Sequence, residues 1–188
     1  MRTFVAIDLP SEVRRNIAHL IDLLRPAGDQ VRWARPENLH VTLKFIGELP
    51  TESIPEATHR LSSIRTPEPL SLQVHGVGYF PNERAPRIIW LGLKSGPELS
   101  VLASQVEEAV LPLGVAKDKR PFAPHLTVGR LKTPGRIPAV QEILRRRDPL
   151  DFGSFAAKDF YLYESQLATG GSVYRKIARF AFVANSPK

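Results

Sequence analysis

Apolar and polar positions recur along the chain with two periods, one typical of β-strands and the other of α-helices. Alternation or short apolar runs predict strands at residues 4–7, 31–33, 39–46, 70–74, 87–93, 125–131, 157–164 and 174–183. Apolar positions three or four residues apart predict helices at residues 11–25, 51–65, 98–113 and 137–147. Proline and glycine lie at several of these boundaries, where they end helices and form turns.

Strands outnumber helices in this pattern, and the helices are interspersed among the strands. Each half of the chain contains helices, one strand with the sequence His-x-Thr-x, and further strands. No long linker or low-complexity segment separates the two halves. The pattern therefore predicts a single α+β domain over residues 1–188, built from two roughly duplicated lobes with a groove between them.

The clearest sign of duplication is a short motif that occurs once in each half, as His40-Val41-Thr42-Leu43 and as His125-Leu126-Thr127-Val128. In a strand, side chains two residues apart point to the same face, so each histidine shares a face with a threonine. The apolar residues of each motif point the other way. Each motif thus predicts a strand that buries one face and presents an imidazole beside a hydroxyl on the other.

Two such strands facing one another would place two imidazoles around one substrate atom. Imidazole titrates near pH ~6.5, so one ring can accept a proton while the other donates one. Threonine hydroxyls can donate hydrogen bonds to phosphate oxygens. A lone His-x-Thr motif is weak evidence of catalysis, but its recurrence favours metal-free phosphoryl transfer with His40 and His125 as the acid–base pair.

The composition is typical of a soluble globular protein, with 43% hydrophobic and 24% charged residues. A net charge of +7 favours a polyanionic partner. The chain has no cysteine, which excludes disulfides, iron–sulfur clusters and thiolate zinc sites. Residues 1–10 are too short and too polar for a signal peptide or a membrane span, so we expect a cytoplasmic protein without a membrane partner.

Longer stretches around the motifs resemble the two-histidine (2H) phosphoesterase superfamily, and within it the RNA 2′,3′-cyclic phosphodiesterases, first described as 2′–5′ RNA ligases. The family signature is a pair of His-x-Thr/Ser-x motifs, and this chain keeps both histidines and both threonines. The similarity covers nearly the whole chain. It is carried by residues 2–10 (RTFVAIDLP), 31–33 (VRW), 36–47 (PENLHVTLKFIG), 120–130 (RPFAPHLTVGR) and 163–165 (YES).

This resemblance implies a bilobal fold with two antiparallel sheets, flanking helices and a central cleft, and an enzyme without a cofactor. The family hydrolyses the 2′,3′-cyclic phosphate ends of RNA to a 2′-phosphate, and some members reversibly join 2′–5′ linked RNA. It favours His125 as the acceptor of a proton from water and His40 as the donor to the departing 3′ oxygen, although the residues alone do not distinguish the two rings. Thr42 and Thr127 are expected to hold the non-bridging oxygens.

Four further residues are candidates for contacts with the substrate. Arg130 is a candidate phosphate clamp; strict alternation points it to the core, but a kink at Gly129, which the resemblance supports, would bring it to the cleft. Lys44 shares the polar face of the first motif by alternation. Phe45 and Trp33 are the aromatic rings near that motif that can stack on RNA bases. Alternation places Phe45 in the core, whereas the resemblance makes it a base platform.

Two other functions remain open at this point. A metal-dependent hydrolase needs three or four ligands, and neither motif has a carboxylate at ligand spacing. A non-catalytic module that binds RNA ends fits the charge and the aromatic residues, although binding alone would be served by lysine or arginine in place of the histidines. The substrate also stays open among tRNA fragments, other RNA ends and small cyclic nucleotides, and we expect a monomer.

Overall fold

The computed structural model describes residues 1–66, 70–169 and 171–183. Its strands are β1 (Arg2–Asp8), β2 (Val31–Trp33), β3 (His40–Glu48), β4 (Leu70–Phe80), β5 (Ile88–Ser95), β6 (His125–Leu131), β7 (Asp151–Ala157), β8 (Asp159–Ala168) and β9 (Gly171–Ala181). Its α-helices are α1 (Ser11–Leu24), α2 (Ile54–Ser62), α3 (Glu98–Val110) and α4 (Pro138–Arg145). None of the helices within these ranges has the length and hydrophobicity that crossing a bilayer requires.

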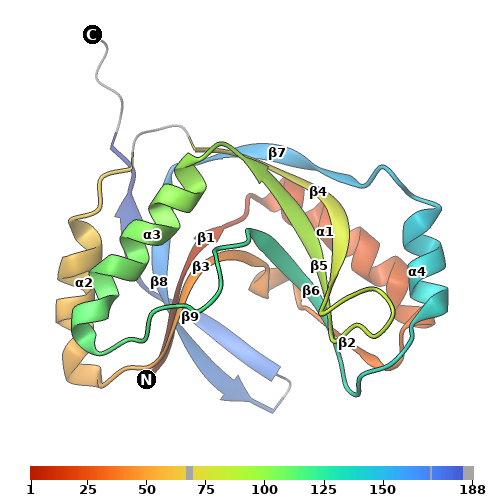
Figure 1. Cartoon of the computed structure of the whole chain (residues 1–188), viewed down its shortest axis with the longest axis horizontal. Coiled ribbons are helices and arrows are strands. Elements are labelled where there is room, and N and C mark those ends of the chain that lie inside the picture. The colour runs from red at the N-terminus through yellow and green to blue at the C-terminus, as the bar shows by residue number, and fades with distance from the viewer. Residues whose placement is uncertain (67–69, 170, 184–188) are drawn as a thin grey trace, which may run out of the picture.

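Two antiparallel sheets form the framework of the molecule (Figure 1). The first sheet has the strand order β3-β1-β8-β9, and the second has the order β2-β6-β5-β4-β7. Each motif strand pairs with an antiparallel neighbour, β3 with β1 and β6 with β5. Strand β3 is at the edge of its sheet, whereas β6 also pairs with the edge strand β2. The predicted α+β fold with two antiparallel sheets and internal duplication is therefore confirmed.

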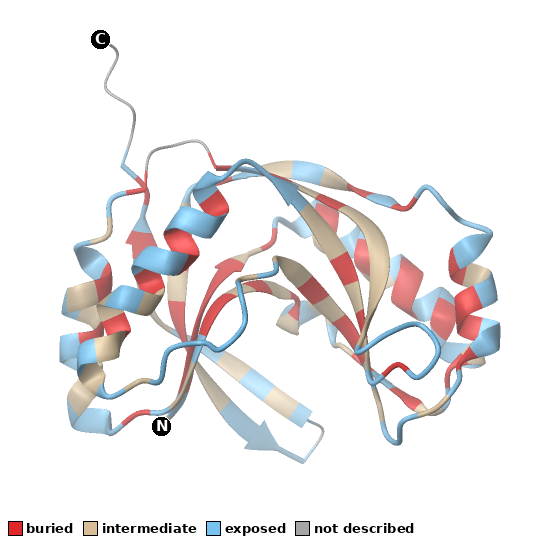
Figure 2. Cartoon of the chain, in the orientation of Figure 1, coloured by how far each residue is buried: buried red, intermediate tan, exposed pale blue. Residues whose placement is uncertain are grey.

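Each sheet packs against a helix that follows a strand of the other sheet. Helix α1 follows β1 of the first sheet but packs against β7 of the second. Helix α3 follows β5 of the second sheet but packs against β3 of the first. Figure 2 shows buried residues on the sides of these helices that face the sheets. The buried apolar residues of both halves form one continuous core cluster, so the exchange of helices joins the two sheets into a single unit.

The predicted elements are present, although several of their bounds differ and one strand was not predicted. The helix expected at residues 51–65 is a 3-10 turn, Thr51–Ser53, followed by α2. Strand β7 was not predicted, because Phe152 is an extra residue in its ladder with β4 and interrupts the alternation. The strand expected at residues 157–164 begins at Asp159, because Lys158 connects β7 of one sheet to β8 of the other.

Candidate active site

Both motif strands have an extra residue directly after the motif threonine, and β3 has a second one farther along, at Ile46. In β3 the extra residue is Leu43, which the ladder with β1 skips. In β6 it is Val128, which the ladder with β5 skips. Each bulge follows the motif threonine directly, and such a bulge reverses which face the later side chains point to. The two copies of the motif thus share a backbone irregularity as well as a sequence.

The bulges decide where three candidate residues lie. We call the face of each sheet that carries the motif histidine and threonine the motif face. Arg130 is exposed and Phe45 is 62% exposed, because the bulges turn both to this face. The expectation from alternation that Phe45 lies in the core is therefore wrong. Arg130 does reach the motif face as the resemblance implied, through the bulge at Val128, one residue before the expected kink.

Lys44 points the other way, and its prediction as a residue of the motif face is wrong. Its side chain is 1% exposed, and its ammonium group contacts Glu107 of α3 at 2.7 Å, Asp118 at 2.9 Å and the Ala116 carbonyl at 2.9 Å. Although burial opposes it, the hydrogen bonds that Lys44 donates to these carboxylates raise the pKa of its ammonium group. The lysine therefore ties the first motif strand to α3 and to the segment that leads into the second motif.

Trp33 is also a core residue rather than a base platform. It is 9% exposed and belongs to the continuous core cluster. A Cβ at Gly129 would lie 2.7 Å from Val31 and 3.2 Å from the Trp33 ring, so the glycine lets β2 pack closely on this side of the sheet. Phe45 is thus the only one of the two predicted stacking rings that faces solvent.

The two catalytic candidates are held by the same hydrogen bond. The Nδ1 atom of His40 lies 2.6 Å from the carbonyl oxygen of Asn38, and that of His125 lies 2.7 Å from the carbonyl oxygen of Ala123. A carbonyl oxygen only accepts, so each Nδ1 carries the proton. Each Nε2 is therefore the atom that is left to accept or donate a proton, which is the arrangement that general acid–base catalysis needs.

The His40 ring is enclosed by aromatic side chains of the first sheet. Its centroid lies 4.8 Å from the ring of Phe4, 5.3 Å from that of Tyr174 and 6.3 Å from that of Tyr163. Burial lowers the pKa of His40 to about 4, while the Asn38 carbonyl acts in the opposite direction. A positive charge on His125 lowers the pKa of His40 further. Strands β3 and β6 are in contact, which brings the two motifs together.

His125 is bordered by aromatic rings of the second sheet. Its ring lies edge-on to Phe80 at 5.2 Å and to Trp90 at 6.1 Å. A Cβ at Gly78 would overlap the Trp90 ring at 2.0 Å, so the missing side chain makes room for that indole. The aromatic surroundings of both histidines lie outside the motifs and were not predicted.

Asp8 and Arg14 support the first motif, and the sequence analysis did not identify either of them. Asp8 pairs with His40 across the β1–β3 ladder, and its carboxylate accepts hydrogen bonds from Arg14 and Lys176. Burial raises the pKa of Asp8, but these cations outweigh it and leave the pKa below its ordinary value. Arg14 also donates to the carbonyl oxygens of Pro36 and Leu39. It therefore fastens the segment that precedes His40.

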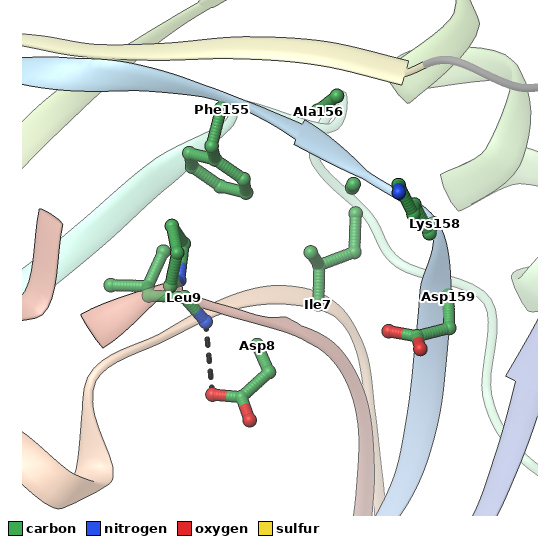
Figure 3. Close-up of a pocket in the computed structure, with 9 residues that line it drawn as sticks. Ile7, Asp8, Leu9, Phe155, Ala156, Lys158 and Asp159 are labelled. Atoms are coloured by element: carbon green, nitrogen blue, oxygen red, sulfur yellow. Dashed lines mark hydrogen bonds between the residues drawn. The ribbon is translucent and has the colours of Figure 1, made fainter. Parts of the chain in front are cut away.

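A pocket of about 240 Å³ lies next to this support, where the chain crosses from β7 to β8 (Figure 3). Its lining includes Asp8, Leu9, Phe155, Lys158 and Asp159. Figure 3 shows the backbone N–H of Leu9 donating to the Asp8 carboxylate, at 2.9 Å. The two motifs contribute nothing to this lining, so the pocket adjoins the candidate site through Asp8 alone.

The polar side chains of the two motifs offer donors but no metal-ligand cluster. Within the described residues, the hydroxyls of Thr42 and Thr127 make no hydrogen bond, although both side chains are partly exposed on the motif face. No group of three or more His, Asp or Glu side chains in the described ranges is placed to hold a metal ion. Two imidazoles, two hydroxyls and a guanidinium form a donor set that suits an anionic phosphate ester.

A comparison with known protein families finds the same duplication in this chain. The model of the LigT-like phosphoesterases matches residues 7–90 and again residues 91–174, so one match covers each motif. The chain belongs to the LigT-like phosphoesterase family. The resemblance drawn from the two motifs is thereby confirmed, and the two matches meet within β5.

Relatives of this LigT-like phosphoesterase match over nearly its full length. It is 38% identical to an RNA 2′,3′-cyclic phosphodiesterase of Archaeoglobus fulgidus, over 96% of this chain and 99% of that protein. It is similar to the crystal structure of TT0787 of Thermus thermophilus, with a TM-score of 0.80, 31% identity and coverage of 99% and 100%. It is also similar to E. coli LigT complexed with 3′-AMP, with a TM-score of 0.78, 30% identity and coverage of 96% and 97%.

Proposed function

We propose that this phosphoesterase hydrolyses the 2′,3′-cyclic phosphate ends of RNA to 2′-phosphates without a metal ion. The observation that carries the proposal is the matched pair of histidines, each with Nδ1 bound to a backbone carbonyl and Nε2 left for proton transfer. The relatives named RNA 2′,3′-cyclic phosphodiesterase support the substrate class.

The reaction assigns one proton transfer to each histidine. His125, neutral, accepts a proton from water as the water oxygen attacks phosphorus. The bond between phosphorus and the 3′ oxygen breaks, and His40, protonated, donates its Nε2 proton to that oxygen. The product carries a 2′-phosphate and a free 3′-hydroxyl. Attack and departure occur on opposite sides of phosphorus, which is consistent with one histidine on each sheet.

Because the pKa of His40 is low, this scheme requires the bound substrate to favour the protonated ring. With a pKa of about 4, His40 is neutral near pH 7 in the free protein. The negative charge of a bound phosphodiester stabilises the imidazolium and raises this pKa. The acid is therefore charged when the substrate is present. With a 5′-hydroxyl in place of water, the same two transfers form a 2′–5′ linkage as the bond to the 3′ oxygen breaks. Exchange of the two roles gives the reverse reaction, in which the 3′-hydroxyl attacks phosphorus, the 5′ oxygen leaves and the cyclic phosphate forms again.

The other residues of the motif face hold the substrate. The hydroxyls of Thr42 and Thr127 donate hydrogen bonds to the non-bridging phosphate oxygens, where charge increases in the transition state. Arg130 supplies a fixed positive charge to the same oxygens. Phe45 offers its exposed ring as a stacking surface for a base of the RNA end.

The partner in this scheme is single-stranded RNA, including fragments of tRNA, bound by a cytoplasmic monomer. The net charge of +7 favours such a polyanion. The structure of E. coli LigT complexed with 3′-AMP supports a nucleotide as a ligand of this site.

The product of the reaction tests the proposal. The protein is incubated with an RNA oligonucleotide that ends in a 2′,3′-cyclic phosphate, in the presence of EDTA, and the terminal monophosphate is identified. We expect a 2′-phosphate. A 3′-phosphate would contradict the assigned direction of ring opening, and activity that requires added metal would contradict the acid–base scheme. Tight binding of the RNA end without turnover would favour a non-catalytic binding module.

A further inference from the structure

Two arginines lie directly opposite one another on the motif face of the second sheet. Arg32 of β2 is the register partner of Arg130 of β6, so the two side chains share a face. Both are exposed. The neighbouring residues Trp33 and Gly129, also register partners, belong to the buried side of the sheet. Arg32 therefore extends the face that carries His125 and Thr127 by one strand.

Within the part of the chain that the structure describes, no carboxylate forms an ion pair with either arginine. Like charges directly opposite one another destabilise a sheet. Other exposed arginines, such as Arg15, are also unpaired, but in the described ladders only Arg32 and Arg130 face another arginine as register partner. The requirements of folding do not account for this arrangement. An external anion does, because a guanidinium presents a planar fork of donors that matches phosphate.

We propose that Arg32 binds the phosphodiester on the 5′ side of the terminal nucleotide, an inference that rests on the proposed function. The terminal nucleotide carries the cyclic phosphate on its 2′ and 3′ oxygens, and its 5′ oxygen leads to the next phosphodiester. Arg130 lies on the motif strand itself. Arg32 lies on the edge strand β2, about 4.8 Å farther across the sheet, so it faces the phosphate that follows.

This assignment makes Arg32 a residue that distinguishes RNA from a mononucleotide. Adenosine 2′,3′-cyclic phosphate lacks a 5′ phosphodiester and leaves Arg32 without a ligand. The dinucleotide ApA with a 2′,3′-cyclic phosphate end is the smallest substrate that contains it. A preference for RNA ends over small cyclic nucleotides would then come from Arg32 on β2, which does not contact the reacting phosphate.

The test compares these two substrates in the wild-type protein and in Arg32→Gln. We expect kcat/KM for the dinucleotide to fall about tenfold, as for loss of a charged hydrogen bond, while kcat/KM for the mononucleotide stays unchanged. Arg32→Lys keeps the charge and should recover part of the loss. Arg15→Gln, which removes an exposed arginine of α1, is the matched control. Added KCl should reduce dinucleotide turnover less steeply in Arg32→Gln than in the wild type.

Equal losses for both substrates, or no loss for either, would overturn the assignment. Binding of the products, 2′-AMP and ApA with a 2′-phosphate end, gives the same comparison without turnover. If the wild-type protein hydrolyses neither substrate, the proposed function fails, and the ratio of the two dissociation constants in Arg32→Gln and wild type still decides the role of Arg32.

Discussion

Phe45 and Arg130 occupy equivalent positions, each five residues after a motif histidine and each turned to the motif face by one extra residue in its strand. Without the bulges at Leu43 and Val128, both side chains would point into the core. The same irregularity therefore delivers an aromatic ring beside one histidine strand and a cation beside the other. A duplicated backbone thus presents two different side chains, which we propose as two different contacts with the substrate.

Replacement of Phe45 by alanine should weaken RNA binding with little effect on folding. The ring is 62% exposed, so its removal costs little stability. Stacking of a base on an aromatic ring contributes about 1–3 kcal/mol. We expect KM for a cyclic-phosphate RNA to rise roughly tenfold or more, with kcat less affected, and Phe45→Trp to retain the wild-type KM. Val101→Ala, at another exposed apolar side chain, is the control. An unchanged KM in Phe45→Ala would exclude the stacking role.

Replacement of Lys44 by methionine should destabilise the protein strongly. It leaves Glu107, whose side chain is 16% exposed, without its main partner. Loss of one member of a buried ion pair costs about 3–5 kcal/mol. The free energy of unfolding, measured in urea, should fall by this amount, and Glu107→Gln in the same chain should restore part of it.

The matched control is Lys117→Met. This lysine pairs with Glu108 at the surface, at 3.5 Å, and both side chains are more than half exposed. Exposed pairs contribute about 0–1 kcal/mol. Similar losses in Lys44→Met and Lys117→Met would show that the buried network does not hold the first motif strand to α3.

The protonation of His40 should depend on bound phosphate. In the free protein its pKa is about 4, so the ring is neutral above pH 5 and charged only in stronger acid. Titration of the histidine ring protons by NMR should give this value, and addition of 2′-AMP should raise it. In kinetics, kcat/KM should report the low pKa of the free protein, and kcat should report a higher value from the complex. A pKa near 6.5 with no response to 2′-AMP would contradict the proposed role of the substrate.

The sequence was sufficient to predict the two motif strands and the four helices, because these follow from periodicity and from a recurring motif. It was not sufficient to place Lys44, Phe45 or Arg130, because strict alternation fails at a bulge and the sequence has no clear mark for one. Aromatic neighbours such as Tyr163 and Phe80 come from strands distant in sequence. Their positions depend on sheet pairing, which a local pattern does not contain.

The support of His40 by Asp8 and Arg14 was missed for a related reason. Arg14 lies on α1, and its bonds to residues 36–39 depend on how that helix packs across the molecule. Arg32 lies within residues 31–33, one of the segments that carry the family resemblance. Only its register with Arg130 shows which face of the sheet its side chain occupies.

The most direct test of the paired-histidine account is the rate of cyclic-phosphate hydrolysis in His40→Ala and His125→Ala, in EDTA, with His59→Ala as the control. General acid–base catalysis contributes about 10²–10⁴-fold, so each of the first two variants should lose at least a hundredfold in kcat while His59→Ala retains wild-type activity. Near-full activity in either His40→Ala or His125→Ala would contradict the account.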